Sequence, residues 1–350
     1  MTDEFERIAQ LFRPLTEGAP EAFGLLDDAA AISSRPGQDL IVTKDAVVEG
    51  VHFLGGDPPD LVARKLFRAN LSDLAAKGAE PYAYFLAVAW PTGWDEAART
   101  AFAAGLAEDQ RRYGIKLLGG DTVSTPGPFT ASLTALGWVP AGAMVRRAGA
   151  KVGDVVLVSG TIGDGTLGLD AAKGGLSELA LADRDALIDR YRLPQPRLNL
   201  RAALRANAHA AADVSDGLLA DVGHIAKASE VGIEIDLDRL PVSAAAQAWL
   251  ATQPDTAAAL VRLATGGDDY EVVCTAPETA VIALSAAGMT PIGRVTRGEG
   301  VSARNMMQPC CSPSRRWGRR RSMAAATPRP PPASMSTSRR SPCRSSTRGG

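Results

Sequence analysis

The stretch Ala212–Ala220 constrains the fold more than any other part of the chain. It reads A-D-V-S-D-G-L-L-A, so the carboxylates of Asp213 and Asp216 flank the hydroxyl of Ser215, and a glycine follows at once. An apolar segment leads into it, and residues 218–225 continue with the apolar spacing of a helix. The pattern predicts a strand that runs into a helix, with the acids at the junction. One such junction is commonly a simple helix cap, because Ser and Asp accept hydrogen bonds from the N–H groups of the first helical turn.

Acidic side chains recur at other strand ends, loops and apolar faces. In the strand L-I-V-T-K-D the period of two places Thr43 and Asp45 on one face and Lys44 on the other. In the helix expected over residues 58–78, an aspartate falls on an otherwise apolar stripe, where an uncompensated charge is costly. The recurring acids are Asp28, Asp45, Asp73 and Asp121, the last directly after a short strand.

The first 150 residues favour one sheet with helices on one face. Their expected order is strand, helix, strand, helix, strand, strand after a short amphipathic helix, which is typical of an α+β layer. The expected elements are a helix over 4–13, strands over 40–45, 83–90, 115–118 and 129–139, and helices over 58–78 and 95–113.

The second half alternates strands and helices, which predicts an α/β domain. Strands are expected at 155–159, 208–212, 232–237 and 290–295, with helical segments between them. We therefore predict a mixed α/β (α+β) protein with an N-terminal domain over 1–150, a C-terminal α/β sandwich over 151–300 and a tail over 301–350.

The predicted tail differs from the rest in charge. Residues 301–350 contain eleven Arg and no Lys, Asp or Glu, whereas residues 1–300 carry 27 basic and 39 acidic side chains. This composition is typical of disorder. A reading frame lost near codon 300 would explain the sudden loss of acids and of periodicity. An Arg-rich nucleic-acid-binding tail is the alternative.

Several classes of protein are disfavoured by the sequence. No apolar run approaches the roughly 20 residues of a membrane span, and the polar start is no signal peptide, so we expect a cytoplasmic protein without a membrane partner. The four cysteines have no zinc-site spacing. A P-loop is absent. Gly163–Gly168 matches G-x-G-x-x-G, but the region where a second strand and its acid should follow looks helical, so a tight turn opening a helix is preferred to a dinucleotide site.

Converging carboxylates point to a hard metal ion. Their mutual repulsion raises pKa values unless cations are present. Oxygen ligands without His or Cys clusters select Mg²⁺ above all. Several such ions suit a polyphosphate whose charge must be neutralised before a nucleophile approaches. The residues therefore predict a Mg²⁺-dependent phosphoryl-transfer enzyme without a P-loop, and leave the acceptor open.

Seven motifs in this order resemble the thiamine-monophosphate kinase family, of the superfamily that includes aminoimidazole ribonucleotide synthetase and selenophosphate synthetase. They cover about residues 5–295, and three of them taken together are specific: E-G-V-H-F, N-L-S-D-L-A-A and G-G-D-D-Y-E. The seven stretches are L-D-D-A-A, T-K-D-A-V-V-E-G-V-H-F, N-L-S-D-L-A-A-K-G-A, L-L-G-G-D-T, R-R-A-G-A-K-V-G-D, D-V-S-D-G-L and T-G-G-D-D-Y-E.

The resemblance implies ATP-dependent phosphorylation of thiamine monophosphate to thiamine diphosphate by a homodimer whose N-terminal sheets associate, with the active site between domains and no nucleic-acid partner. It implies in-line attack by the substrate's own phosphate, catalysed through Asp213, Asp216 and Arg147. The implied Mg²⁺ ligands are Asp28, Thr43, Asp45, Asp73, Asp121, Asp213 and Asp216. The implied nucleotide contacts are Gly120, Asp121, Arg147 and Ser215, and the implied substrate contacts are His52 and Asp268, the latter near the cationic thiazolium.

Some alternatives stay open at this point. Arg146 competes with Arg147 for the phosphates. Leu26 and Lys44 stand where the family commonly has glycine and a small hydroxylated residue. The family's last sheet segment and its substrate-stacking aromatic residue have no counterpart after residue 300, and Trp317 is not credited with that role. The rival functions are another ATP-dependent synthetase of the superfamily, disfavoured by G-G-D-D-Y-E and by the lack of an N-terminal cysteine, and a catalytically impaired, nucleotide- and Mg²⁺-binding dimer.

Overall fold

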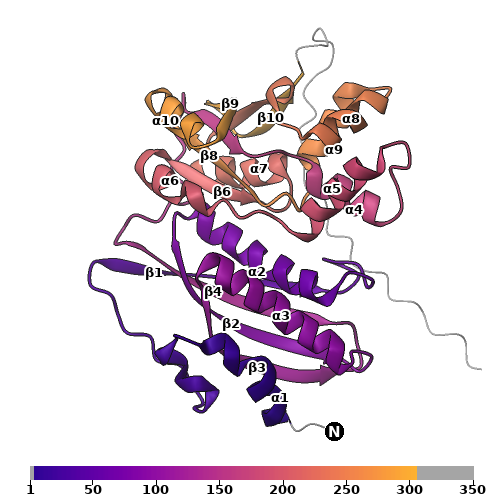
Figure 1. Ribbon diagram of the computed structural model, residues 1–350. Helices are drawn as coiled ribbons and strands as arrows, with labels where there is room; N and C mark the ends of the chain where they lie inside the picture. Colours follow the sequence, from indigo (N-terminus) through magenta and orange to yellow (C-terminus); the bar gives the residue numbers. More distant parts are fainter. Residues whose placement is uncertain (1–3, 306–350) are drawn as a thin grey trace, which may run out of the picture. The chain divides into compact units, whose positions relative to one another are not determined.

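The computed structural model describes residues 4–305 and contains two β-sheets with helices packed on them (Figure 1). The first sheet comes from residues 38–140 and the second from residues 155–304. The predicted mixture of α and β structure in two sheets is confirmed. The exact domain limits stay a prediction, and the predictions for residues 306–350, Trp317 included, lie outside the described residues.

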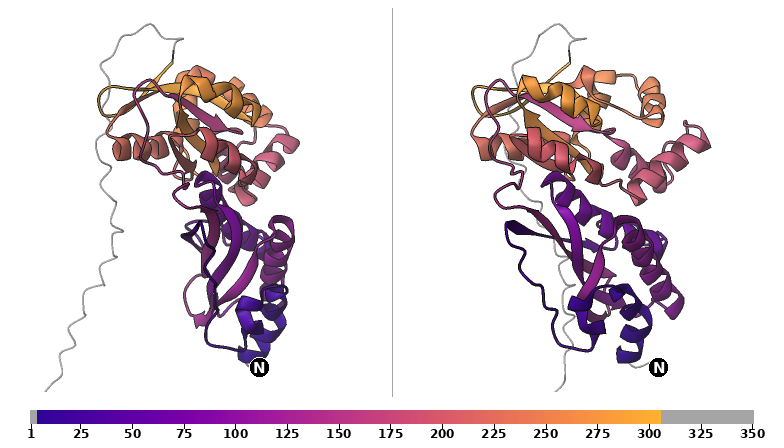
Figure 2. Two further views of the ribbon diagram at one scale, coloured as in Figure 1. Left: turned by 90° about the vertical axis from the view of Figure 1, so that its left-hand side faces the viewer. Right: turned by 60° about the vertical axis from the view of Figure 1, so that its left-hand side comes forward.

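The first sheet has the strand order β1-β4-β2-β3, in which only β2 and β3 are parallel. Helices α2 and α3 lie on one of its faces (Figures 1 and 2), as the sequence predicts. The elements are α1 (Glu4–Leu11), η1 (Arg13–Thr16), η2 (Pro20–Leu25), β1 (Gln38–Val48), α2 (Pro59–Ala76), β2 (Glu80–Pro91), α3 (Glu96–Tyr113), β3 (Lys116–Thr125) and β4 (Thr130–Pro140).

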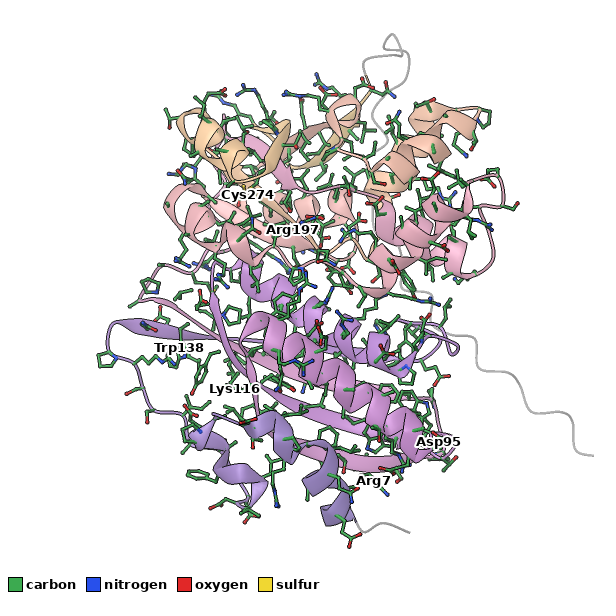
Figure 3. All side chains as sticks on the ribbon, in the orientation of Figure 1. Arg7, Asp95, Lys116, Trp138, Arg197 and Cys274 are labelled. Carbon is green, nitrogen blue, oxygen red and sulfur yellow. The ribbon has the colours of Figure 1, made fainter. Side chains whose placement is uncertain are left out.

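Local signals and aromatic packing fix these helices. The side chain of Asp95, labelled in Figure 3, accepts a 2.9 Å hydrogen bond from the N–H of Ala98 and so caps α3. Under the helices the rings of Trp90 and Phe129 pack on Phe102, with centroids 5.5 and 5.3 Å from it. Rings at this separation in edge-on or tilted geometry add to the free energy gained by burying their area.

The strands of this sheet have an inner face toward α2 and an outer face away from it. Asp45, Leu133, Leu86 and Gly120 form one row across the four strands, and the two leucines are buried with α2 in the inner core. Asp121 is the next residue along β3, so it belongs to the outer face. The outer face also carries the exposed side chains Val42 and Val123 (57% and 51% exposed) and Lys44. Lys44 thus points away from Asp45, as the alternation predicts.

The second sheet has the order β10-β7-β9-β5-β8-β6, and all pairs except β10 with β7 are antiparallel. Its strands are β5 (Val155–Ser159), β6 (Ala210–Val214), β7 (Gly232–Asp236), β8 (Glu271–Ala276), β9 (Met289–Thr296) and β10 (Gly300–Arg304). Its helices are α4 (Asp164–Ala172), α5 (Leu181–Arg192), η3 (Leu198–Leu200), α6 (Arg201–Asn207), α7 (Leu218–Ser229), η4 (Leu237–Arg239), α8 (Ala244–Thr252), α9 (Thr256–Thr265), η5 (Glu278–Ala280) and α10 (Val281–Ala286).

Two features of the strands differ from the prediction. β3 continues to Thr125 instead of ending at residue 118, because it pairs with β2 along its length. Asp121 is therefore inside a strand and not at its end. β10 extends past the predicted limit of residue 300, because residues 300–304 pair in parallel with β7.

Arg68 on α2 forms a buried ion pair within the first half and a hydrogen bond to the second half. Arg68 donates to both carboxylate oxygens of Asp109 on α3 (2.7 and 3.0 Å) and to the carbonyl of Pro194 (3.2 Å). Both side chains are fully buried, where breaking such a pair is strongly destabilising. This contact holds α2 in place, and α2 carries part of the site described next.

Candidate active site

A cavity of about 480 Å³ lies between α2, β1 and the loops around residues 215 and 267. It gathers residues from both halves of the chain. Eight of the twelve site residues predicted from the sequence line it: Asp45, His52, Asp73, Arg147, Asp213, Ser215, Asp216 and Asp268. The remaining lining residues include Lys65, Ala69, Thr166, Leu169, Gly267 and Tyr270.

The acids in the cavity repel one another. Burial, followed by the carboxylates of Asp73 and Asp216, raises the pKa of Asp45 to about 6. Burial and the carboxylate of Asp73 raise the pKa of Asp213 well above its usual range. The hydroxyl of Thr43 donates to Asp73, which explains how an acid is tolerated on the apolar stripe of α2. Thr43 thus touches the acid group from β1 although it does not line the cavity itself.

Backbone hydrogen bonds join the two loops that carry the remaining acids. The N–H of Asp268 donates to the carbonyl of Ser215 (2.9 Å), and the N–H of Tyr270 donates to that of Val214 (2.8 Å). Gly267 permits this approach, because a Cβ there would lie 2.5 Å from the Ser215 carbonyl oxygen. Gly217, at φ +112, turns the chain from β6 into α7. The predicted strand-to-helix junction is confirmed, but neither of its acids caps the helix.

Asp221, which sequence reasoning missed, organises that junction. Its carboxylate accepts from the N–H groups of Ser215 (3.0 Å) and Asp216 (3.1 Å). Burial, followed by the charge of Asp216, raises the pKa of Asp221 to about 7. Asp216, Asp221 and His224 place their ligand atoms within 4.8 Å of one another. Asp221 and His224 are three residues apart on α7, and this spacing could have indicated that they share a face of the helix.

Two basic groups border the acids. Lys77, also missed, donates from Nζ to the carbonyl of Ala211 (2.9 Å), and burial, then the charge of Arg147, lowers its pKa. Both arginines are exposed, but Arg147 lines the cavity and Arg146 is not among the lining residues. The arrangement favours Arg147 over Arg146 as the group that meets an anionic ligand.

The glycine-rich motif at Gly163–Gly168 has a structural role. The carboxylate of Asp269 accepts from the N–H groups of Gly163 (2.7 Å) and Gly165 (2.9 Å), at the start of α4. This acid belongs to G-G-D-D-Y-E, so the first turn of α4 fixes the loop that carries Asp268. The preferred interpretation, a tight turn that opens a helix, agrees with this geometry.

His52 lies in a turn at the cavity edge. Its Nδ1 accepts from the N–H of Val48 (3.1 Å), which leaves the proton on Nε2 and that nitrogen available as a donor. The carbonyl of His52 accepts from the hydroxyl of Tyr191 (3.4 Å). The histidine therefore both closes a turn and lines the cavity.

Three predicted site residues lie elsewhere in the chain. Gly120 and Asp121 are on β3, which is the opposite edge strand from β1. Asp28 is exposed after η2, close to Ala30 and Ile32, which pack on outer-face residues such as Leu136. Asp28 and Asp121 are thus on the outer side of the sheet, while Asp45 is on the inner side. One chain alone does not bring them to the acid cluster.

Known proteins show the same architecture and much of the same sequence. The family model for the N-terminal domain of AIR synthase related proteins matches residues 26–139, and that for the C-terminal domain matches residues 151–304. A thiamine-monophosphate kinase from Caulobacter vibrioides is 58% identical over 306 residues, which is 86% of this chain and 86% of that protein. The chain belongs to the thiamine-monophosphate kinase family.

Solved structures of the family agree with this membership. The thiamine-monophosphate kinase of Stenotrophomonas maltophilia is 38% identical, with a TM-score of 0.75 over 85% of this chain and 95% of that one. AaThiL complexed with AMPPCP and TMP is 30% identical, with a TM-score of 0.71 over 86% of this chain and 93% of that one. The family named by these relatives is the one predicted from the sequence motifs. In the part of the chain that the structure describes, no helix is long and apolar enough to cross a membrane.

Proposed function

We propose that this protein transfers the γ-phosphoryl group of ATP to thiamine monophosphate, which yields thiamine diphosphate and ADP. The observation that carries the proposal is the meeting of Asp45, Asp73, Asp213 and Asp216 in one cavity of a chain that belongs to this kinase family. Its relative AaThiL was solved in complex with AMPPCP and TMP, which supports the binding of both a nucleotide and the acceptor by this fold.

The reaction needs no protein nucleophile. An oxygen of the substrate's phosphate forms the new bond to the γ-phosphorus while the bond from that phosphorus to the β-phosphate bridge breaks, and ADP leaves with the bond electrons. The acceptor oxygen is already ionised, so no base is required. The protein contributes positioning and charge compensation. Arg147 is suited to bind the nucleotide phosphates through its fork of donors, and the hydroxyl of Ser215 is placed to contact them.

The oxygen-rich cavity fits Mg²⁺. Its acids are crowded enough to raise the pKa of Asp45 to about 6, and a divalent cation would relieve that repulsion. Asp45, Asp73, Asp213 and Asp216 would hold the ions, with Thr43 fixing Asp73 from β1. When bound, Mg²⁺ neutralises the charge of the polyphosphate.

The pKa of Asp45 predicts how stability depends on pH and on Mg²⁺. Its folded pKa of about 6 exceeds the ordinary 3.8, so the folded state binds more protons between these values. Without divalent ions the free energy of unfolding therefore falls as the pH rises through that window. Mg²⁺ competes with the protons, and we expect it to raise the melting temperature by at least about 3 °C more near pH 7.5 than near pH 5.

Thermal denaturation at both pH values, with and without Mg²⁺, measures this difference. Asp45→Asn should reduce the Mg²⁺ effect near pH 7.5. Equal Mg²⁺-induced shifts at the two pH values would contradict the assignment of these acids as ion ligands.

The protein acts as a homodimer in this proposal, joined through the outer faces of the first sheets. Val42 and Val123 are more than half exposed there, and an association of outer faces would cover them. The same association would place Asp28 and Asp121 of one subunit near the partner. They would reach the partner's acids around its edge strand β1, which carries Asp45.

Formation of thiamine diphosphate from thiamine monophosphate and Mg²⁺-ATP tests the function directly. We expect turnover that depends on both ATP and Mg²⁺, and none with unphosphorylated thiamine as acceptor. Binding of ATP in a Mg²⁺-dependent way without turnover would support the rival, a catalytically impaired nucleotide-binding dimer. Turnover of other acceptors alone would favour a different synthetase of the superfamily.

A further inference from the structure

Lys65 is a buried cation that the mechanism above does not use. Its side chain is 4% exposed, and its Nζ lies 3.4 Å from Oδ2 of Asp268 and 3.6 Å from the centroid of the Tyr191 ring. Among the described residues, Nζ has no hydrogen-bond partner with acceptable geometry. A buried ammonium has three donors, and leaving them unsatisfied costs free energy. Because Lys65 lines the cavity, a ligand there is the available acceptor.

The position of Lys65 on α2 disfavours the transferring phosphate as its partner. Lys65, Ala69 and Asp73 follow one another at intervals of four residues and all line the cavity. Lys65 and Asp73 are thus two turns, or about 12 Å, apart along the helix. The lysine side chain leans toward the helix N-terminus, away from Asp73. Its ammonium therefore points away from Asp73, toward the end of the cavity formed by Asp268 and Tyr191.

We assign this end of the cavity to the organic part of the acceptor, an assignment that rests on the proposed function. That part of thiamine monophosphate consists of a thiazolium cation and an aminopyrimidine. An ammonium repels a thiazolium. The aminopyrimidine instead has a ring nitrogen that accepts a hydrogen bond, next to an exocyclic amine that donates one. Lys65 and Asp268 offer the complementary pair, a donor and an acceptor 3.4 Å apart.

We propose that Lys65 and Asp268 bind the aminopyrimidine edge of the substrate, with the lysine donating to a ring nitrogen and the aspartate accepting from the exocyclic amine. Asp268 then pairs with this edge rather than with the thiazolium that the sequence suggested. Lys65 becomes a residue that determines specificity for the organic end of the acceptor.

The backbone conformation around Asp268 supports its role as a preorganised hydrogen-bond acceptor for the substrate. Asp268 and Tyr270 both have positive φ values (70° and 51°) although neither is a glycine. Non-glycine residues persist in this region only where their surroundings hold them there, and here the hydrogen bonds to Ser215 and Val214 do so. The backbone that carries the Asp268 carboxylate is therefore held next to Lys65 before any ligand arrives.

Kinetics of Lys65→Met with two acceptors test the proposal. We expect the KM for thiamine monophosphate to rise about 10- to 100-fold, because the substrate's ring nitrogen and Asp268 lose a partner. The kcat and the KM for ATP should change less than about 3-fold. The second acceptor is oxythiamine monophosphate, in which an oxygen replaces the exocyclic amine. In its lactam form the neighbouring ring nitrogen carries a proton and cannot accept a hydrogen bond from Lys65, so the unaltered enzyme should discriminate against it. Lys65→Met should lose the part of that discrimination that Lys65 supplies.

Two variants serve as controls. Lys227→Met removes an exposed lysine on α7 and should alter neither KM. Lys65→Arg keeps a charged donor and should restore part of the affinity. The proposal is overturned if Lys65→Met leaves the KM for thiamine monophosphate unchanged, or if it weakens both acceptors by the same factor, since the latter indicates lost packing only.

Calorimetric binding of thiamine monophosphate separates this proposal from the proposed function. If the unaltered protein binds the compound without turning it over, the kinase activity fails, and the Kd of Lys65→Met for the two acceptors still decides the role of Lys65. If the unaltered protein does not bind thiamine monophosphate at all, both proposals fall.

Discussion

Asp213→Asn should lower the rate of thiamine diphosphate formation by about 100- to 1,000-fold while leaving the fold intact. Asp213 is 5% exposed at the end of β6, at the centre of the acid cluster. The amide has nearly the same volume as the carboxylate, so packing is kept and the change removes only a charge and an anionic ligand. In the proposed mechanism that charge holds the ions on which charge compensation depends.

The same substitution should have the opposite effect on stability without Mg²⁺. The pKa of Asp213 is raised by burial and by Asp73, so its ionised form is unfavourable in the folded protein at neutral pH. Removing the charge should keep or raise the melting temperature of the ion-free protein and reduce the stabilisation by Mg²⁺. A purely structural role would lower both activity and melting temperature.

Asp185→Asn is the matched control, because Asp185 is exposed on α5 and does not line the cavity. It should keep full activity. Retention of more than about a tenth of the activity by Asp213→Asn would remove Asp213 from the catalytic machinery.

The sequence predicts the residues of this site best where a local pattern positions them. The alternation of β1 places Thr43 and Asp45 toward α2 and Lys44 away from it, and each of these orientations is found. The apolar stripe of α2 singles out Asp73 for the same reason. In these cases the geometry of one strand or one helix decides the direction of the side chain.

The sequence patterns do not predict contacts between segments that lie far apart in the chain. Lys65 resembles an ordinary surface lysine of an amphipathic helix, and it is buried only because Tyr191 and Asp268 come from segments more than 120 residues away. The glycines before Asp121 suggest a turn, yet pairing with β2 keeps them in a strand. Pairing partners override local preference in such strands.

For Asp121 we predict that mixing two variants, each inactive alone, restores enzymatic activity. Asp121 and Asp45 are on opposite faces and on the two edge strands of a four-stranded sheet, so their strands are about 14 Å apart. If Asp121 is a ligand of the active site, it must serve the partner's site. Asp121→Ala and Asp213→Ala should then each be inactive alone.

A mixed dimer of the two variants contains one site with both substitutions and one site with neither. Random exchange of subunits makes half of the dimers mixed, so co-refolding or co-expression at equal amounts should restore about a quarter of the unaltered activity. If Asp121 acted within its own chain, every site of the mixed dimer would carry one substitution, and no activity would return. Asp73→Ala mixed with Asp213→Ala is the matched control, because both residues line the same cavity in one chain and the mixture should stay inactive. Recovery in the first mixture alone would establish both the dimer and the exchange of Asp121 between its subunits.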